Sequence, residues 1–191
     1  RKYIQTLDGE SSFAKWNSSG TLLVGAVYGG TKIWDTNTWK CIQTLEGNGN
    51  FAVWNYSGTL LAIGSYATIR IWDTNTWTCI QTLEGHTQSV TSVAWNTQGT
   101  MLVSGSYDDT IKIWDTATWE CIKTLEEHTR SVTSVAWNPQ GTLLASGSYD
   151  RSIKIWDSNT WNCIQTIEGH TRCVSSVAWN FSGILLASGS L

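Results

Sequence analysis

The dipeptide Trp-Asp recurs along the chain at a nearly constant spacing, and this repetition limits the possible folds more than any other feature. It begins at residues 34, 72, 114 and 156, so successive copies are 38, 42 and 42 residues apart. The segment Cys-Ile-x-Thr follows each copy and begins at residues 41, 79, 121 and 163. Self-similarity at a period of about 40 residues is typical of repeat proteins, in which small similar units stack in a line or a ring. The chain is therefore expected to be an array of such units.

Each unit has the pattern of four short β-strands. In residues 128–167 we predict strands at Val132–Trp137, Leu143–Ser148, Ile153–Trp156 and Cys163–Ile167, because these segments are rich in apolar or β-branched residues and end at turn residues. No segment keeps a helical period over about ten residues, which indicates an all-β chain. A four-stranded meander of this size cannot bury both of its faces alone, so neighbouring units must cover them.

The composition narrows the functional classes. The chain has 191 residues, with 12 Lys and Arg against 15 Asp and Glu, and this balance offers no basic surface for nucleic acid. No apolar run approaches the roughly 18 residues of a membrane span, and Arg1 to Gln5 show no signal-peptide core. The lack of an initiator Met suggests a processed chain or an excised piece of a longer one. We expect an intracellular protein, cytoplasmic or nuclear, with no nucleic-acid or membrane partner.

Four of the five cysteines occupy one position of the repeat. Cys41, Cys79, Cys121 and Cys163 would lie far apart in a radial array, whereas a disulfide needs Cα atoms within about 7 Å. We interpret them as small buried apolar side chains of an intracellular protein, in preference to metal or redox roles.

The elements of the unit, taken together, resemble the WD40 repeat. In the most complete copy His128 is followed by Ser-Gly-Ser-Tyr-Asp at residues 146–150 and by Ile-Lys-Ile-Trp-Asp at residues 153–157. Four Trp-Asp copies in register, with the Gly-His and Ser-Gly-Ser elements, extend the resemblance over essentially the whole chain. It implies an all-β propeller, whose four-stranded antiparallel blades pack radially around a central channel.

The resemblance also implies a hydrogen-bond network within a blade. It links a His before the first strand, a Ser of the second strand, an Asp of the following turn and a Trp of the third strand. Carried over to this chain, the two networks comprise His86, Ser104, Asp108 and Trp114, and His128, Ser146, Asp150 and Trp156. Buried Trp and His side chains need partners for their polar atoms, so a structural role is expected. A Ser-His-Asp trio can also suggest a catalytic triad, but here it recurs in successive blades with a Trp beside the Ser.

We expect residues 1–191 to form a single propeller segment of about four and a half repeats. The predicted division is residues 1–8 as the fourth strand of a split blade, 9–46 as blade 1, 47–84 as blade 2, 85–126 as blade 3, 127–168 as blade 4 and 169–191 as a partial blade. Blades 1 and 2 are four residues shorter and lack the His, the turn Asp and the Ser of the network. Trp34 and Trp72 must then find other acceptors or water, so these blades are predicted to be looser than the next two.

The two ends of the array pose a packing problem, because an open arc leaves one apolar blade face bare at each end. A bare face on the order of 500 Å² would cost roughly 12 kcal/mol at about 25 cal/mol/Å². That cost is too large for a marginally stable domain. We therefore expect the faces to be covered by sequence outside this chain or by another copy, with a strained five-bladed closure as the remaining alternative.

Two sets of residues are candidate contacts for a protein or peptide partner. The resemblance places four tyrosines on the rim of the channel face, one residue before the turn Asp: Tyr28, Tyr66, Tyr107 and Tyr149. Aromatic side chains are favoured anchors in interfaces. The same face carries Gln88, Arg130 and Arg172 at the starts of first strands, where the arginines could recognise acidic groups. The alternatives are copying of one repeat without selection for binding, and ordinary solvated loop charge.

A tryptophan stands where the family commonly has glycine, in the turn between the third and fourth strands. These residues are Trp39, Trp77, Trp119 and Trp161. We expect them to pack across their own hairpin, and an assembly surface is the alternative.

The leading functional interpretation is an interaction scaffold that binds a protein or peptide through the loop face of the propeller. The alternative is a self-assembling structural module, a homo-oligomer joined through incomplete terminal blades. No catalytic, cofactor-binding or metal-binding residue is predicted, because no acid, base or nucleophile differs from its copies in the other repeats. We therefore expect no enzyme activity and no cofactor.

Overall fold

The computed structural model describes residues 13–27, 30–47 and 49–191, and these residues form β-strands joined by turns and loops, with no helix among them. This confirms the all-β prediction. The four strands predicted within residues 128–167 are all present, and the third extends one residue further, to Asp157. The division of the chain into blades remains a prediction, and its first part, residues 1–8, lies outside the described residues.

The described strands form four-stranded antiparallel sheets in which each strand pairs with the next one in the chain. The first sheet contains β1 (Ala14–Trp16), β2 (Leu22–Val27), β3 (Gly30–Asp35) and β4 (Cys41–Leu45). The second contains β5 (Phe51–Trp54), β6 (Leu60–Ser65), β7 (Thr68–Asp73) and β8 (Thr78–Leu83). The third contains β9 (Val90–Trp95), β10 (Met101–Ser106), β11 (Ile111–Asp115) and β12 (Cys121–Leu125). The fourth contains β13 (Val132–Trp137), β14 (Leu143–Ser148), β15 (Ile153–Asp157) and β16 (Cys163–Ile167), and a two-stranded sheet contains β17 (Val174–Trp179) and β18 (Leu186–Ser190).

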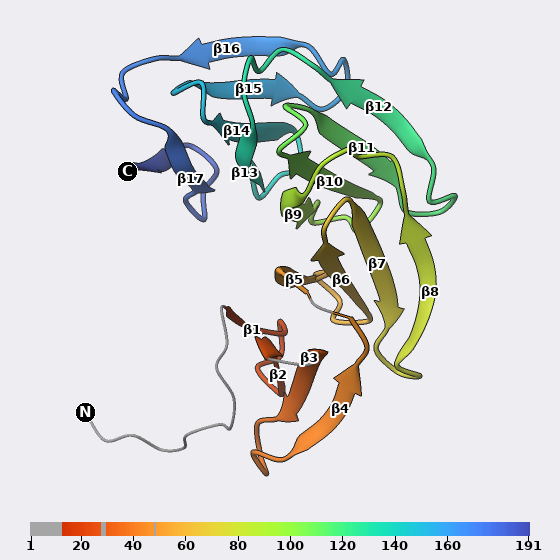
Figure 1. Ribbon diagram of the computed structural model, residues 1–191. Coiled ribbons are helices and arrows are strands. Elements are labelled where there is room, and N and C mark those ends of the chain that lie inside the picture. The colour runs from red at the N-terminus through yellow and green to blue at the C-terminus, as the bar shows by residue number, and fades with distance from the viewer. Residues whose placement is uncertain (1–12, 28–29, 48) are drawn as a thin grey trace, which may run out of the picture.

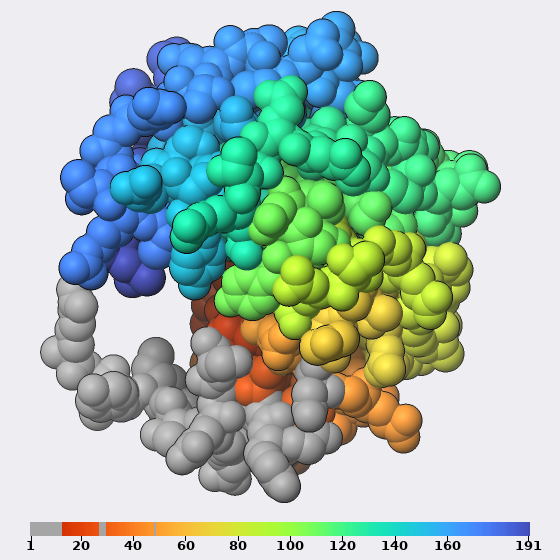
Figure 2. Space-filling view, turned by 45° about the horizontal axis from the view of Figure 1, so that its top comes forward, coloured from red at the N-terminus to blue at the C-terminus, as the bar shows by residue number. Residues whose placement is uncertain are grey.

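The sheets follow one another in chain order along an arc (Figures 1 and 2). The first strands β5, β9, β13 and β17 lie on the inner side of the arc, and the fourth strands β8, β12 and β16 lie on its outer side (Figure 1). At each seam the first strand of one sheet contacts the first and second strands of the preceding sheet. In the part of the chain that the structure describes, the sheets do not close into a ring.

The apolar core is divided among the seams between neighbouring sheets. At one seam, Ile69 and Ile71 of the second sheet are fully buried in a cluster with Val90, Val93 and Leu102 of the third. Burial of apolar side chains stabilises such a seam by about 25 cal/mol for each Å² removed from water. Each sheet is therefore held in place by its neighbours.

The glycine of the Ser-Gly-Ser element is required for steric reasons at one of these seams. A Cβ atom on Gly105 would lie 2.6 Å from Cγ1 of Val132 in the next sheet. Since real Cβ contacts are longer than this, only glycine allows the first strand of the fourth sheet to approach so closely.

The turns between third and fourth strands explain the Asp of the Trp-Asp dipeptide. The Oδ1 atom of Asp35 accepts hydrogen bonds from the backbone of Thr38 (2.7 Å) and Asn37 (3.0 Å) and from the Thr38 hydroxyl (2.9 Å). The hydrogen bonds from Thr38 lower the pKa of Asp35. The same arrangement recurs at Asp73, Asp115 and Asp157.

The turn tryptophans adopt the left-handed backbone conformation that favours glycine. Their φ angles are 56° at Trp39, 55° at Trp77, 62° at Trp119 and 58° at Trp161. Each indole packs edge-on against the Trp that ends the first strand of its own sheet, as in the pair Trp95–Trp119 with ring centroids 6.1 Å apart. The packing stays within one sheet, but it reaches the first strand rather than the residue's own hairpin.

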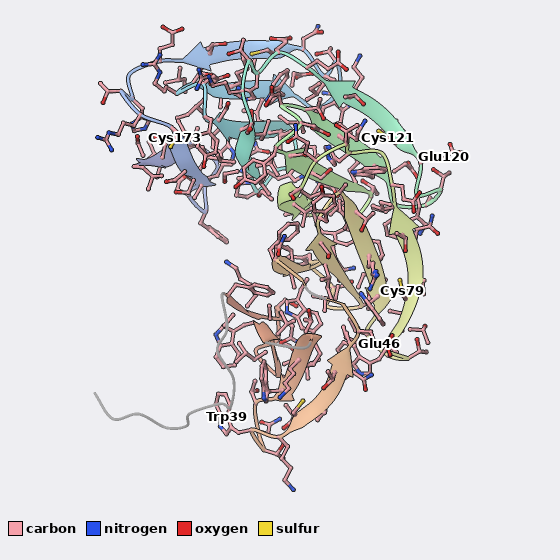
Figure 3. All side chains as sticks on the ribbon, viewed as in Figure 1. Trp39, Glu46, Cys79, Glu120, Cys121 and Cys173 are labelled. Atoms are coloured by element: carbon pink, nitrogen blue, oxygen red, sulfur yellow. The ribbon has the colours of Figure 1, made fainter. Side chains whose placement is uncertain are left out.

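The prediction that the repeated cysteines are buried is wrong. Cys41, Cys79 and Cys121 are exposed, and Cys163 is half-buried. Figure 3 labels Cys79 and Cys121 on the outer strands β8 and β12. These strands are paired on one side only, so most of their side chains face solvent and only the last residue of β4, β8 and β12 is buried. All five cysteines are free thiols.

Candidate functional site

The third sheet contains a continuous hydrogen-bond network of four side chains. Nε1 of Trp114 donates to Oγ of Ser104 at 2.9 Å, and this oxygen lies 2.8 Å from Nε2 of His86. The other ring nitrogen of His86 lies 2.8 Å from Oδ2 of Asp108. The network joins the loop before β9 to strands β10 and β11 and to the turn between them. It therefore fixes that turn relative to the sheet.

The hydrogen bonds determine which nitrogen of His86 carries the proton. Because Oγ of Ser104 accepts the indole N–H, its own hydroxyl proton is available to Nε2 of the imidazole. Nδ1 then carries the ring proton and donates it to Asp108. Burial lowers the pKa of His86, and the hydrogen bond to Asp108 opposes this shift. The imidazole is accordingly neutral at neutral pH.

The fourth sheet repeats the network with nearly the same geometry. Trp156 Nε1 donates to Oγ of Ser146 at 2.9 Å, and His128 lies 2.7 Å from both Ser146 Oγ and Asp150 Oδ2. Burial raises the pKa of Asp150, but hydrogen bonds from Ser152 and His128 outweigh it and lower the pKa to about 2. The carboxylate is thus ionised over the whole physiological range.

The same His–Ser contact is present in the two-stranded sheet, where the sequence interpretation did not single it out. Nε2 of His170 lies 2.8 Å from Oγ of Ser188. The available signal was the dipeptide Gly169-His170, which occupies the position of Gly85-His86.

The first and second sheets lack this network, as their sequences require. Nε1 of Trp72 is buried without a hydrogen-bond partner, as is Oγ1 of Thr31. In the second sheet the space above Gly64 is filled by the ring of Phe51, since a Cβ atom there would lie 1.8 Å from Cζ of that ring. Apolar packing thus takes the place of polar contacts. The greater looseness expected of these sheets stays a prediction.

Of the predicted tyrosines, Tyr66, Tyr107 and Tyr149 lie at the loops between second and third strands, and the structure brings the last two together. The rings of Tyr107 and Tyr149 have centroids 6.3 Å apart at an angle of 54°. Both are exposed, as is Tyr66 in the second sheet. Tyr28 lies outside the described residues.

Two adjoining hollows surround this pair of tyrosines. One of about 390 Å³ is lined by Tyr107, Asp109, Arg130, Ser131 and Tyr149. The other, of about 420 Å³, shares both tyrosines and extends to residues of the inner strands, including Ser89, Thr91, Thr133 and Cys173. Asp109, Ser131 and Cys173 were not among the predicted contacts, although Ser131 and Cys173 directly follow the predicted residues Arg130 and Arg172.

Of the predicted polar contacts, only Arg130 lines these hollows. Gln88 and Arg172 are exposed at the equivalent positions of neighbouring sheets. Their carbonyl groups accept hydrogen bonds from Ser106 and Ser190, as that of Arg130 does from Ser148. The three side chains therefore share one backbone arrangement, but the structure does not bring them to one site.

Comparison with protein families identifies the repeat. Four segments match the model of the WD domain, G-beta repeat (WD40), at residues 39–73, 77–115, 119–157 and 161–191. This chain belongs to the WD40 repeat family. A comparison with curated proteins finds no match.

Each matched WD40 repeat is offset from the sheets. It begins at a turn tryptophan, such as Trp39, and contains the fourth strand of one sheet followed by strands of the next. Every repeat therefore links two neighbouring sheets covalently.

WD40 repeats generally mediate protein–protein interactions, and WD40 proteins are typically non-enzymatic scaffolds that bind protein partners. Among the described residues, no group of three or more His, Cys, Asp or Glu side chains is placed to hold a metal ion. The described part of the chain also has no helix long and apolar enough to cross a bilayer.

Proposed function

We propose that this WD40 chain is an interaction scaffold that binds a protein or peptide through its loop face, with Tyr107 and Tyr149 as the central anchors. The observation that carries the proposal is this exposed aromatic pair above two adjoining hollows. Tyrosine is among the residues that most often dominate binding energy in interfaces. An excess of acidic over basic residues favours a protein partner over nucleic acid.

The backbone that carries the anchors is held rigidly. The Tyr149 N–H donates to the carbonyl of Ser131 at 2.9 Å. The next residue, Asp150, is tied to His128, and its N–H donates to Oγ of Ser148 at 3.0 Å. A surface whose backbone is already ordered loses less entropy on binding. The His–Ser–Asp–Trp network thus supports binding by positioning the tyrosines.

The chemistry of the hollow indicates the kind of partner. The two rings line the hollow together with Arg130 and Asp109, which carry opposite charges. Such a site suits a peptide segment with an apolar or aromatic side chain and a neighbouring charged group. Arg130 can bind a carboxylate through two parallel hydrogen bonds.

Selection from a random-peptide phage library on the purified chain tests this proposal. Enriched peptides should bind the Tyr107→Ala and Tyr149→Ala variants at least about tenfold more weakly than the original chain, as expected for anchor residues. Tyr56→Ala is the matched control, because this tyrosine is also exposed but lines neither hollow. Failure to enrich any peptide, or binding that both variants retain, would contradict the proposal.

A further inference from the structure

Neighbouring sheets are joined by an indole hydrogen bond at three of the four seams between described sheets, whereas Nε1 of Trp137, at the seam between the third and fourth sheets, is buried without a partner. The Trp that ends a first strand donates through Nε1 to a carbonyl in the first strand of the preceding sheet. The observed bonds run from Trp54 to Lys15 at 3.2 Å, from Trp95 to Val53 at 3.1 Å and from Trp179 to Ala136 at 3.1 Å. In each case the acceptor immediately precedes the Trp of its own strand.

A serine hydroxyl makes the second recurring contact. Oγ of Ser92 accepts from the N–H of Val135 at 3.2 Å, and Oγ of Ser134 accepts from the N–H of Val177 at 3.2 Å. The acceptor belongs to the preceding sheet and the donor to the following one, as with the carbonyls above. The seam is therefore directional, with different groups on its two sides.

Apolar side chains complete each seam. At the last one, Leu143 and Ala145 of the fourth sheet pack with Val177 and Trp179 of the two-stranded sheet. The preceding sheet thus contributes small and aliphatic residues, and the following sheet contributes the Trp.

At its end of the arc, the first sheet carries the residues that a following sheet contributes to a seam, and no other described sheet packs against them. Trp16 occupies the position of Trp54 and Trp95, yet it is 54% exposed, whereas those two are 8% and 9% exposed. Beside it lie Leu23 and Trp34, which are only 7% and 6% exposed and form an apolar cluster with the half-buried Trp39, so Trp16 is the exposed part of this face. This face, defined by these four residues, is called the Trp16 face.

At the other end of the arc, the two-stranded sheet carries the residues that a preceding sheet contributes to a seam. Leu185 is 66% exposed and occupies the position of Leu143. Ala187 is also exposed, although its counterpart Ala145 is completely buried. Ser176 and Ala178 stand at the positions of Ser134 and Ala136, with the hydroxyl and the carbonyl that accept at an internal seam. This face, defined by Ser176, Ala178, Leu185 and Ala187, is called the Leu185 face.

We infer that this chain binds a second copy of itself head to tail, with the Trp16 face of one copy against the Leu185 face of the other. At this contact Nε1 of Trp16 would donate to the carbonyl of Ala178. Ser176 Oγ would accept from the N–H of Ala14, which occupies the position of Val135. Another copy is the fitting occupant because the two faces are the two halves of the seam that already joins the sheets inside the molecule.

The contact is heterologous, since each copy contributes a different face. Such contacts generate rings when the rotation closes and filaments when it does not. Figure 1 shows β1 and β17 at the two ends of the arc, so both faces are presented by one molecule. The inference goes beyond the proposed function, because these faces lie at the ends of the arc and not on the loop face.

Sedimentation velocity of the 191-residue chain over a wide range of concentrations tests the inference. We expect either a ring of constant mass or a mass that grows with concentration. Trp16→Ala and Leu185→Lys should each weaken self-association about 30-fold or more, as expected for the loss of a central anchor. Ile184→Lys is the matched control, because Ile184 is also exposed but occupies the position of the turn residue Thr142.

Mixing the two variants separates head-to-tail binding from other arrangements. The Trp16→Ala protein keeps an intact Leu185 face, and the Leu185→Lys protein keeps an intact Trp16 face, so an equal mixture should form a dimer with one copy of each. Circular dichroism of each variant verifies that it is folded. A monomer at all concentrations, an oligomer unaffected by both substitutions, or a folded pair that stays monomeric on mixing would overturn the inference.

Discussion

Nε1 of Trp156 donates a hydrogen bond of 2.9 Å to Oγ of Ser146, and both residues are almost completely buried. This bond connects the Trp of the Trp-Asp dipeptide to the His and Asp that hold the loop carrying Tyr149. The repeated motif therefore links the core of a sheet to the face proposed to bind a partner.

Replacement of Ser146 by alanine should destabilise the fourth sheet. Trp156 Nε1 and His128 Nε2 would both lose their partner while remaining buried, and an unsatisfied buried polar group costs about 1–3 kcal/mol. Urea unfolding followed by tryptophan fluorescence measures the change. Ser188→Ala is the matched control, since Ser188 occupies the equivalent position in the two-stranded sheet but is exposed. Equal losses in the two variants would contradict the network's role.

The two kinds of Trp in third strands should respond differently to phenylalanine. Trp114→Phe removes a hydrogen bond to Ser104, whereas Trp72→Phe removes an N–H that has no partner. We expect Trp114→Phe to cost about 1–2 kcal/mol more than Trp72→Phe, because only the former breaks a buried hydrogen bond. Chemical denaturation of both variants checks the difference. A larger loss at Trp72 would show that its indole nitrogen has a partner after all.

The chain should lose stability on acidification in two steps. Burial lowers the pKa of His86 and His128 below 6.5, so below this pH the unfolded chain takes up protons that the folded chain does not. Their contribution is fully present above pH 6.5 and falls as the pH drops toward the folded pKa. Asp150 adds a second loss between its ordinary pKa of 3.8 and its folded pKa of about 2. Unfolding curves at several pH values test this, and a chain that becomes more stable below pH 6 would contradict it.

The left-handed turn at Trp119 should prefer glycine to alanine. Both substitutions lose the edge-on contact with Trp95, but only glycine adopts a φ of 62° without strain. We expect Trp119→Gly to be more stable than Trp119→Ala by about 1 kcal/mol. Thermal unfolding of the two proteins measures this difference, and the reverse order would mean that the turn rearranges when the indole is removed.

Local features of the unit were predictable because they depend on residues close together in the chain. Strands such as Val132–Trp137 follow from β-branched residues bounded by turn residues. The Asp of the Trp-Asp dipeptide accepts hydrogen bonds from backbone groups two and three residues away, so Asp157 and its counterparts in the other repeats have the same role. Because the unit repeats, the strands predicted for one copy also apply to the other copies.

Relations between units were decided only by the tertiary structure. The exposure of Cys121 depends on β12 being the outer strand of its sheet, paired on one side only. The contact between Tyr107 and Tyr149 depends on how the fourth sheet packs against the third. The contrast between exposed Trp16 and buried Trp95 is the sharpest case, since the two occupy the same position of the repeat. The sequence alone determined which residues make a sheet and which of its side chains are apolar. The tertiary structure decided which of those side chains meet another sheet, because burial depends on the neighbour that packs against a residue and not on the residue itself.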